Sequence, residues 1–330
     1  MPEREPPTGA GPAGAGTVVD TGGAVAGPSV PADTVVLVGG AEPRAATGAA
    51  ARRLGWGGKL AIGWLALVVA AALLAPILPL DDPYDPTGSI ARKGPGTDGH
   101  LLGGDGLGRD LFSRLVWGSR ASLLIAITSV LLGLIAGGLL GLVAGYFRGR
   151  TDTLFTGVFD VLLSFPQLIL AVTVVTVYAT GEGVSSTRRM IVLILALGIV
   201  SIPVLGRIAR ATTLTWAQRE FVLAARAMGA RNRSIMFREV LPNVLPALFS
   251  IALLGIAVVI VAEGGLSLLG VGVQLPTPSW GNIIAEGRTD LRDAPHIVLI
   301  PTIVIFLTVL ALNYLGDVVR SRFDVRESAL

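Results

Sequence analysis

The chain has 330 residues but no cysteine and only two histidines. The missing cysteines exclude disulfides, thiolate nucleophiles and cysteine-ligated metal sites. Neither histidine has a cluster of carboxylates near it along the sequence, so we expect no metal site. Charged residues are also scarce, at 15% of the chain, whereas soluble domains carry roughly a quarter. These shortages argue against a metalloenzyme, a thiol enzyme and an ordinary soluble protein.

The sequence also lacks the motifs of nucleotide-binding and hydrolytic enzymes. A phosphate-binding loop needs Gly-x-x-x-x-Gly-Lys-Ser/Thr, and the nearest stretch, Gly57-Gly58-Lys59-Leu60, lacks the first glycine and the hydroxyl. The glycines of residues 103–108 have the wrong spacing for a dinucleotide fingerprint, and no strand precedes them. Neither Gly-x-Ser-x-Gly nor His-Glu-x-x-His occurs. We therefore predict no catalytic residues and no cofactor in this chain, and we do not expect it to be an enzyme.

Apolar residues are abundant and lie in long blocks. They make up 52% of the chain, and the mean hydropathy is +0.70. Several blocks reach the roughly 20 residues that cross a hydrocarbon layer about 30 Å thick. The sequence therefore predicts an all-α membrane protein with six transmembrane helices. The predicted spans are residues 60–80, 121–147, 154–179, 190–205, 244–262 and 297–315.

The first 53 residues are rich in Gly, Ala and Pro and show no helical or strand period. Such a segment buries too little apolar surface to offset its ordering entropy. We predict a disordered cytoplasmic tail over residues 1–53 and a transmembrane domain over residues 54–330. The tail does not read as a signal peptide, because no charged start leads directly into an apolar core.

Prolines and glycines modify the predicted spans. Pro166 lies inside the third span, where neighbouring helices can satisfy the freed carbonyl, and Pro203 could end or kink the short fourth span. Gly137 and Gly141 form a small-xxx-small pair suited to close helix packing. The outer connection 263–295 contains the apolar run 266–275, which is too short to span and suggests an interfacial or re-entrant element.

The distribution of basic residues predicts the orientation. Arginines flank the spans on the side that holds both termini, and the connection between the fourth and fifth spans alone carries seven of them. The opposite connections hold many acids, although the pair Arg188–Arg189 opposes this assignment. We therefore predict that both termini are cytoplasmic, in a multi-pass plasma membrane protein. The arginines lie between apolar blocks rather than on a basic face with aromatics, so nucleic acid is not an expected partner.

The basic connection contains a predicted helical hairpin over residues 218–240. Its apolar residues Phe221, Ala224, Ala225 and Met228 recur at helical spacing, and Gly229 is placed to end the helix in a left-handed conformation. A second helix is predicted to start near Asn232 and to stop at Leu241-Pro242. Such a hairpin lies on lipid or docks into a partner protein. The small alanines favour docking.

These residues resemble a known motif. The stretch Leu223-Ala224-Ala225-x-x-x-Gly229, followed by Leu241-Pro242, resembles the "EAA" loop of bacterial ATP-binding-cassette importer permeases. The resemblance implies a type I permease fold and a loop that docks the cytoplasmic ATPase subunit and transmits its closure. Two positions depart from the motif. Leu223 replaces the glutamate that names it, and Glu239 replaces an apolar residue before Leu-Pro, so the family's salt link to the ATPase is not expected here.

Further segments resemble the oligopeptide/dipeptide branch of that family, and specifically its C-type subunit. They occur in order between about Leu60 and Arg326. These segments are His100–Asp110, Gly145-Tyr146-Phe147, Asp152, Asp160, Phe165-Pro166, Glu263–Gly270, Pro276–Gly281 and Leu315-Gly316-Asp317.

The resemblance implies an assembly. A homologous permease subunit would complete a heterodimer with a pathway for di- or oligopeptides, two cytoplasmic ATPase domains would bind ATP and Mg²⁺, and an extracytoplasmic binding protein would deliver cargo. Nickel or another small solute is an alternative cargo for this branch. An ion-coupled secondary transporter is a rival class, but the expected internal repeat of the arginine-rich loop or of Asp160 is missing.

Two acidic residues are candidates for the transport pathway. Asp160 lies well inside the third predicted span, where an insertion cost of roughly 2.5–3.5 kcal/mol predicts that it faces a protein partner or a water-filled path, unless its side chain reaches the interface. Glu263 lies at the outer end of the fifth span, so it lines the mouth of the pathway or sits at the interface.

Overall fold

The computed structural model describes residues 55–327 apart from positions 87, 180 and 182, and side-chain surroundings as far as residue 321. The chain divides into two units, residues 1–48 and 49–330, and all described residues belong to the second. The predicted tail, residues 1–53, lies outside the described residues. The described part is all-helical, without named strands. Its helices are α1 (Trp56–Leu74), α2 (Leu111–Phe147), α3 (Gly149–Ser164), α4 (Gln167–Ala179), α5 (Ser186–Trp216), α6 (Glu220–Ala227), α7 (Asn232–Ser234), π-helical η1 (Ile235–Val240), α8 (Leu241–Leu268), α9 (Trp280–Gly287), 3₁₀-helical η2 (Arg288–Asp290) and α10 (His296–Glu327).

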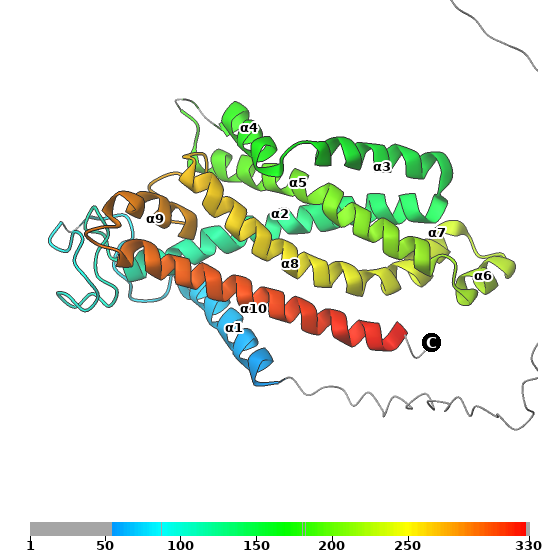
Figure 1. Cartoon of the computed structure of the whole chain (residues 1–330), viewed down its shortest axis with the longest axis horizontal. Coiled ribbons are helices and arrows are strands. Elements are labelled where there is room, and N and C mark those ends of the chain that lie inside the picture. Colours follow the sequence, from blue (N-terminus) through cyan, green and yellow to red (C-terminus); the bar gives the residue numbers. More distant parts are fainter. Residues whose placement is uncertain (1–54, 87, 180, 182, 328–330) are drawn as a thin grey trace, which may run out of the picture. The chain divides into compact units, whose positions relative to one another are not determined.

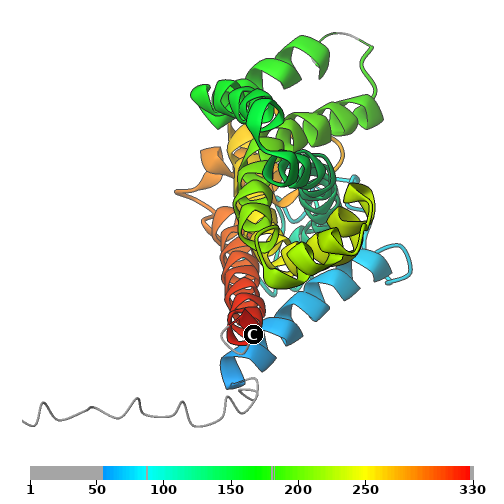
Figure 2. The same ribbon diagram turned by 90° about the vertical axis from the view of Figure 1, so that its right-hand side faces the viewer.

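Long apolar helices dominate the described residues. Five are long and apolar enough to cross a membrane, and the total rises to six if the bent pair α3 and α4 counts as one span. This agrees with the predicted all-α membrane fold. In Figure 1 the long helices lie side by side, with α6 and α7 at one end and α9 with the connection that precedes α2 at the other. Figure 2 shows α1 leaving the other helices at an angle, with α10 next to it.

The third predicted span, residues 154–179, is wrong as one continuous helix. The chain bends by 84° between α3 and α4. Phe165 adopts an extended conformation with φ −85° and ψ 136°, which is the region that a residue before proline prefers. Pro166 provides no N–H to continue the hydrogen-bond ladder. Two short helices therefore take the place of the predicted span.

Pro203 does not end the fourth predicted span. Helix α5 continues through this proline as far as Trp216, so the limits 190–205 are too short. Helix α5 packs closely against α2 along this stretch. A Cβ atom on Gly137 would lie 2.3 Å from the carbonyl oxygen of Ile202, and one on Gly141 would lie 2.2 Å from that of Gly206. The predicted packing role of the glycine pair is confirmed.

Leu241-Pro242 does not stop the helix before the fifth span either. The segment from Asn232 to Leu268 is one helical stretch of 37 residues. The turn over Ile235–Val240 is π-helical, and the Leu241 N–H donates to the carbonyl oxygen of Met236. Pro242 lies in the first turn of α8, where its missing N–H is tolerated. The second arm of the predicted hairpin is therefore the start of a membrane helix.

The outer apolar run, residues 266–275, does not form an element of its own. Its first residues complete α8, which ends at Leu268. Gly270, with φ +79°, closes that helix, and the Val271 N–H donates to the Leu266 carbonyl oxygen at 3.0 Å. The short helix of this region is α9, which begins later, at Trp280.

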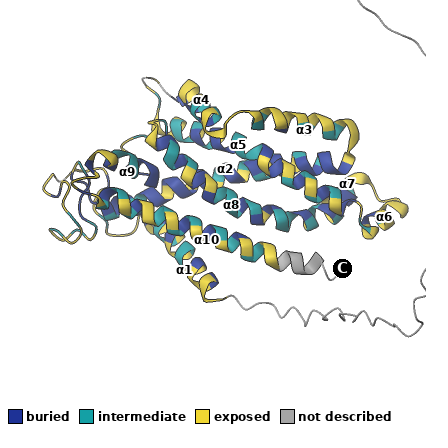
Figure 3. Ribbon diagram, in the orientation of Figure 1, coloured by how far each residue is buried: buried dark blue, intermediate teal, exposed yellow. Residues whose placement is uncertain are grey.

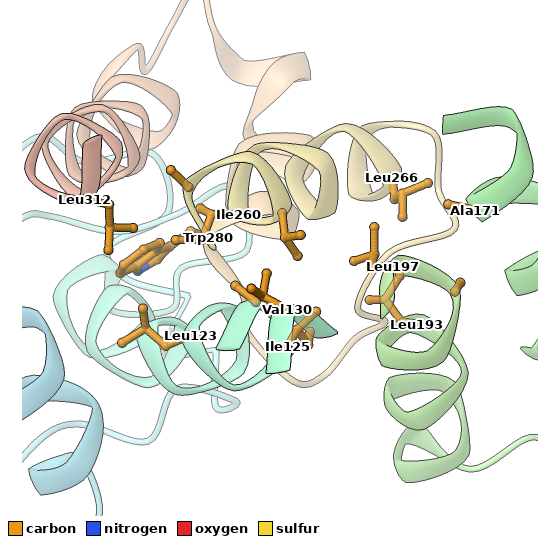
Figure 4. Packing of buried hydrophobic residues seen from close by; sticks show 14 of the residues in the cluster. Leu123, Ile125, Val130, Ala171, Leu193, Leu197, Ile260, Leu266, Trp280 and Leu312 are labelled. Carbon is orange, nitrogen blue, oxygen red and sulfur yellow. The ribbon is translucent and has the colours of Figure 1, made fainter. Parts of the chain in front are cut away.

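The main core lies between the long helices. Figure 4 shows that side chains from α2 (Leu123, Val130), α5 (Leu197), α8 (Ile260) and α9 (Trp280) meet in this core. A smaller cluster lies at the α6 end and is formed by Leu142, Tyr146, Ala209, Trp216, Ala217, Val222, Ile235, Met236, Val240, Val244 and Leu248. The two clusters hold opposite ends of α2, α5 and α8.

Candidate functional site

Helix α6 is a short, well-terminated helix at one end of the long helices. The Gly229 N–H donates to the Arg226 carbonyl oxygen at 3.0 Å, and the Ala230 N–H donates to that of Ala225 at 3.1 Å. Together with φ +80° at Gly229, these bonds form a Schellman motif. The predicted left-handed end of the helix at Gly229 is confirmed. A Cβ there meets open space, so the conformation alone requires glycine.

Val222 anchors α6 in the hydrophobic core. Val222 is fully buried in the smaller cluster, and Ala225 packs against that cluster at its edge. Val222 was not among the predicted site residues, because the sequence gives no sign of which side of so short a helix meets the core. The anchor leaves the remaining apolar residues of α6 facing outward.

The outward surface of α6 is apolar. The side chains of Phe221, Leu223 and Met228 are 38%, 53% and 82% exposed, and Ala224 is exposed beside them. Figure 3 shows α6 largely in the colour of exposed residues. The predicted face of Phe221, Ala224, Ala225 and Met228 therefore exists, with Ala225 as its partly buried edge. We call Phe221, Leu223, Ala224 and Met228 the α6 surface.

Arginines stack on aromatic rings beside the α6 surface. The Arg219 guanidinium lies 5.2 Å from the Trp216 ring centre, and that of Arg226 lies 5.9 Å from the Tyr146 ring centre. Tyr146 also donates its hydroxyl to Asn232 Oδ1 at 3.1 Å. The arginine contacts fix α6 to the ends of α2 and α5, and the Tyr146 hydrogen bond joins α2 to the start of α7.

The remaining predicted residues of the hairpin lie apart from this surface. Leu241 packs against the smaller cluster, and Pro242 is exposed in the first turn of α8. They join the hairpin to a long membrane helix rather than contribute to the α6 surface.

Asp160 is half-exposed and forms an ion pair with Arg207. A second pair lies along the same two helices, where Arg210 Nη2 donates to Asp152 Oδ2 at 2.7 Å. Both pairs join α3 to α5. Sequence analysis singled out Asp160 but not its partner, because the residues are 47 positions apart.

An apolar cavity of about 570 Å³ opens between α2, α4, α5 and α8. Polar side chains contribute little to it, with Gln167 and Ser201 as the main examples. Val204, also in its wall, lies one helical turn before Arg207 on α5. The cavity and the Asp160–Arg207 pair therefore follow one face of α5.

Glu263 is buried, with 1% of the residue exposed, and does not line the mouth of a pathway in this structure. Its carboxylate accepts hydrogen bonds from Ser279 Oγ at 2.8 Å, Ser267 Oγ at 2.9 Å and Ser122 Oγ at 3.3 Å. The pathway prediction for Glu263 is therefore corrected. It failed because Ser122 and Ser279 come from distant parts of the sequence and enclose the carboxylate.

A network of charged side chains lies at the α9 end. Glu286 Oε2 lies 2.8 Å from Arg109 Nη2 and 2.7 Å from Arg114 Nη2. Asp105 Oδ2 accepts from Arg109 Nε at 2.7 Å and also pairs with Arg114. Burial alone would raise the pKa of the Asp105 carboxyl. The Arg109 N–H and the guanidinium groups of Arg114 and Arg109 outweigh burial, so the pKa lies below the ordinary value of 3.8.

His100 lies next to two carboxylates, contrary to the sequence-based expectation. Its Nδ1 lies 3.0 Å from Asp110 Oδ1 and 3.4 Å from Asp81 Oδ2. The three groups lie close enough to share a cation. Asp110 also caps α2 by accepting the Ser113 N–H at 2.7 Å. Folding of the outer connection brings Asp81 to a histidine 19 positions later in the sequence, which inspection of neighbouring residues misses.

Comparison with protein families gives one match that covers more than half of the chain. The profile of the family described as "Binding-protein-dependent transport system inner membrane component" matches residues 137–328. These residues include α6, the Asp160–Arg207 pair and Glu263.

Curated relatives align over most of their length. A "Glutathione transport system permease protein GsiD" of Pectobacterium atrosepticum is 38% identical over 78% of this chain and 83% of its own. The GsiD protein of Salmonella typhimurium is 40% identical over 79% of this chain and 83% of its own length. A "Dipeptide transport system permease protein DppC" of Alkalihalophilus pseudofirmus is 35% identical over 81% and 86%.

A solved structure shares the fold. A chain of the MetNI methionine ABC transporter in an inward-facing conformation superposes with a TM-score of 0.52 at 20% identity, over 63% of this chain and 95% of that chain.

Proposed function

This chain belongs to the family of binding-protein-dependent transport system inner membrane components, and from this premise we propose how it takes part in transport. It is a permease subunit of an ATP-binding-cassette importer in the inner membrane. Its own residues provide no nucleotide-binding motif, so ATP and Mg²⁺ bind to partner ATPase subunits.

The proposed cargo is a small peptide. The relatives named above are glutathione and dipeptide permeases, and glutathione is itself a peptide. Nickel or another small solute is the alternative. The described lining of the cavity between α2, α4, α5 and α8, about 570 Å³ in volume, is mostly apolar and holds no histidine or carboxylate of the kind that binds nickel.

The α6 surface is the proposed docking site for an ATPase subunit, and it is the observation that carries the proposed function. Four apolar residues on a helix with fixed ends face away from the chain, and their exposure is unfavourable unless a partner covers them. The helix presents them as an amphipathic helix presents its apolar face to a groove. Leu223 contributes apolar contact rather than an ionic bond.

The proposed orientation places the α6 end in the cytoplasm and α9 outside. The arginines of α6 and α7 support it, because basic residues concentrate on the cytoplasmic side. A single cysteine at Arg231 or at Arg292 tests it, since both residues are exposed and the chain has no native cysteine. An impermeant thiol reagent should label position 292 on intact cells. Rapid labelling of position 231 instead would reverse the orientation.

A second, homologous permease subunit is proposed to complete the pathway. Half-exposed charges such as Asp160 and Arg207 are costly against lipid, so their face of α3 and α5 is expected to meet water or protein. The neighbouring apolar cavity opens on helices that a partner subunit would cover. In this arrangement Asp160 lies beside the transport pathway.

Transport would follow from movement of the docked helices. Closure of two ATPase domains on ATP would bring the α6 helices of the two permease subunits together. The rigid α2–α5 pair would convert that displacement into a switch between inward-open and outward-open states. An extracytoplasmic binding protein would then release its cargo at the α9 end.

Reconstitution tests the proposed function. The permease pair, the ATPase subunits and the binding protein should together take up a labelled dipeptide or glutathione into vesicles when ATP is present. Uptake of Ni²⁺ without peptide uptake would replace the cargo. If no ATPase subunit co-purifies with the permease pair, the docking proposal is contradicted.

A further inference from the structure

Helix α9 is held at its first turn by α2 and α8. Ser279 caps α9 by accepting the Asn282 N–H at 3.1 Å, and its hydroxyl donates to Glu263 of α8. The Trp280 N–H donates to Ser122 Oγ of α2 at 3.1 Å, and the Trp280 indole Nε1–H donates to the Leu115 carbonyl oxygen at 3.0 Å. The start of α9 is therefore bonded to two membrane helices.

Glu263 is the centre of this junction. Its carboxylate accepts hydroxyls from α2, from α8 itself and from the cap of α9, and it takes part in no ion pair seen among the described residues. A buried carboxylate is costly unless hydrogen bonds compensate its desolvation. Because these donors come from three elements, separation of any one element from the others leaves the carboxylate partly unsatisfied.

The backbones of α8 and α9 also touch. A Cβ on Gly281 would lie 2.7 Å from the Gly264 Cα and 3.0 Å from Glu263 Oε2. Such close contact leaves no space for a side chain between the two helices. The first turn of α9 cannot slide along α8 without breaking the Glu263 hydrogen bonds.

The far end of α9 is attached to α2 as well. Glu286, in the last turn of α9, pairs with Arg114, in the first turn of α2, and Arg114 is fully buried. Two attachments fix both the position and the direction of a helix. Helix α9 is therefore joined to α2 at both of its ends.

Helix α2 itself extends from α9 to α6. Its 37 residues give a length of about 55 Å. Arg114 and Ser122 lie near its α9 end, and Tyr146, under Arg226 of α6, lies in its last turn. Glycines in its second half, among them Gly137 and Gly141, pack this helix closely against α5. A displacement applied at α6 therefore reaches α9 through one helix.

We infer that Glu263 is a positioning residue that makes α9 move as one body with α2 and α8, so that movement of α6 is transmitted to the opposite end of the permease. This inference rests on the proposed function, because it assumes that an ATPase subunit moves α6. Glu263 then acts in transport without contacting the cargo.

Distance measurements between spin labels test the rigid junction in an otherwise unchanged chain. Labels on Leu124→Cys of α2 and Ala285→Cys of α9 use positions that are not fully buried. In the complete transporter we expect one narrow distance distribution that is the same with and without trapped ATP. A nucleotide-dependent shift of this distance would show that α9 moves independently and would overturn the inference.

Substitutions at Glu263 test whether the attachment of α9 to α2 and α8 is needed for the binding protein to stimulate ATP hydrolysis. Glu263→Ala should broaden the distance distribution and lower binding-protein-stimulated ATP hydrolysis about tenfold, a typical coupling between distant sites, with basal hydrolysis retained. Glu263→Gln keeps an oxygen acceptor for the hydroxyls and should retain most of the stimulation. Unchanged stimulation in Glu263→Ala would refute the proposed role.

Two further outcomes distinguish a failure to assemble from a loss of the junction, and a wrong proposed function from a wrong inference. If Glu263→Ala prevents assembly, Ser122→Ala, which removes one hydroxyl and leaves the charge in place, should still broaden the distribution and reduce stimulation. A wild-type-like result for Ser122→Ala would then count against the inference. Absence of ATPase subunits from the purified wild-type complex would refute the proposed function rather than the junction.

Discussion

Arg210 of α5 holds Asp152 of α3 with two nitrogens, and the contact between Nη2 and Oδ2 measures 2.7 Å. The two residues lie 58 positions apart, and both side chains are partly shielded. A bidentate contact between guanidinium and carboxylate fixes geometry as well as charge. This pair attaches α3 to α5, despite the sharp bend that follows α3. The Asp160–Arg207 pair joins the same two helices nearer to that bend.

Exchange of the two charges should show that this attachment is specific. Asp152→Asn should lower the stability of the solubilised permease by about 1.5–3 kcal/mol, the usual range for a hydrogen bond to a charged group. The double variant Asp152→Arg with Arg210→Asp should recover part of the loss. The measurement is the thermal unfolding midpoint. Asp85→Asn, at an exposed position, is the control and should be neutral. No recovery in the double variant would mean that the charges act separately.

The contact between α2 and α5 should tolerate no side chain at Gly141. A Cβ there would lie 2.2 Å from the Gly206 carbonyl oxygen, so Gly141→Leu must separate the two helices. We expect a loss of about 1–3 kcal/mol or more from overpacking, with reduced yield of the complex. Gly157→Leu is the matched control, because a Cβ at Gly157 meets open space. Equal yields of the two variants would contradict the close contact.

These two predictions show which parts of the fold follow from sequence. The spacing of Gly137 and Gly141 on one helix predicts a close contact, because small residues at that spacing have few other uses in membrane helices. The partner helix cannot be read in the same way. Asp152 and Arg210, or Glu263 and Ser122, meet through tertiary packing that leaves no local pattern.

Helix ends were harder to predict than helix existence. Pro166 breaks a helix while Pro203 and Pro242 do not, although all three lie in apolar blocks. Pro242 lies in the first turn of α8, where its missing N–H is tolerated, and Pro203 lies where α5 packs closely on the α2 glycines. For α6, the sequence identified the outward residues and the terminal glycine. The sequence does not indicate that Val222 is the buried residue of this helix, because its burial depends on tertiary packing.

Stability should decrease in acid through Asp105. The pKa of its carboxyl is lower in the folded chain than the ordinary value of 3.8. The carboxylate therefore stabilises the fold above pH 4 or so, and this contribution is lost as pH falls through the folded-state pKa. The thermal midpoint of the wild-type permease should decline below that pH.

Asp105→Asn tests the origin of this acid sensitivity. The variant leaves the buried Arg114 without one of its charged partners, so we expect a loss of about 3–5 kcal/mol at neutral pH. Its midpoint should also depend less on pH in the acid range than that of the wild type. An acid profile that is unchanged by Asp105→Asn would assign the sensitivity to other carboxyl groups.

Co-purification of an ATPase subunit with the permease tests directly whether the α6 surface binds that subunit. Leu223→Asp combined with Met228→Asp places charges at two exposed positions, so the permease itself should fold normally. We expect the ATPase subunit to be lost from the purified complex and ATP-driven uptake to stop. The matched control, Leu107→Asp, changes a similarly exposed leucine at the opposite end and should leave the ATPase subunit bound. Full retention of the ATPase subunit and of uptake in the α6 double variant would show that the subunit does not dock on the α6 surface.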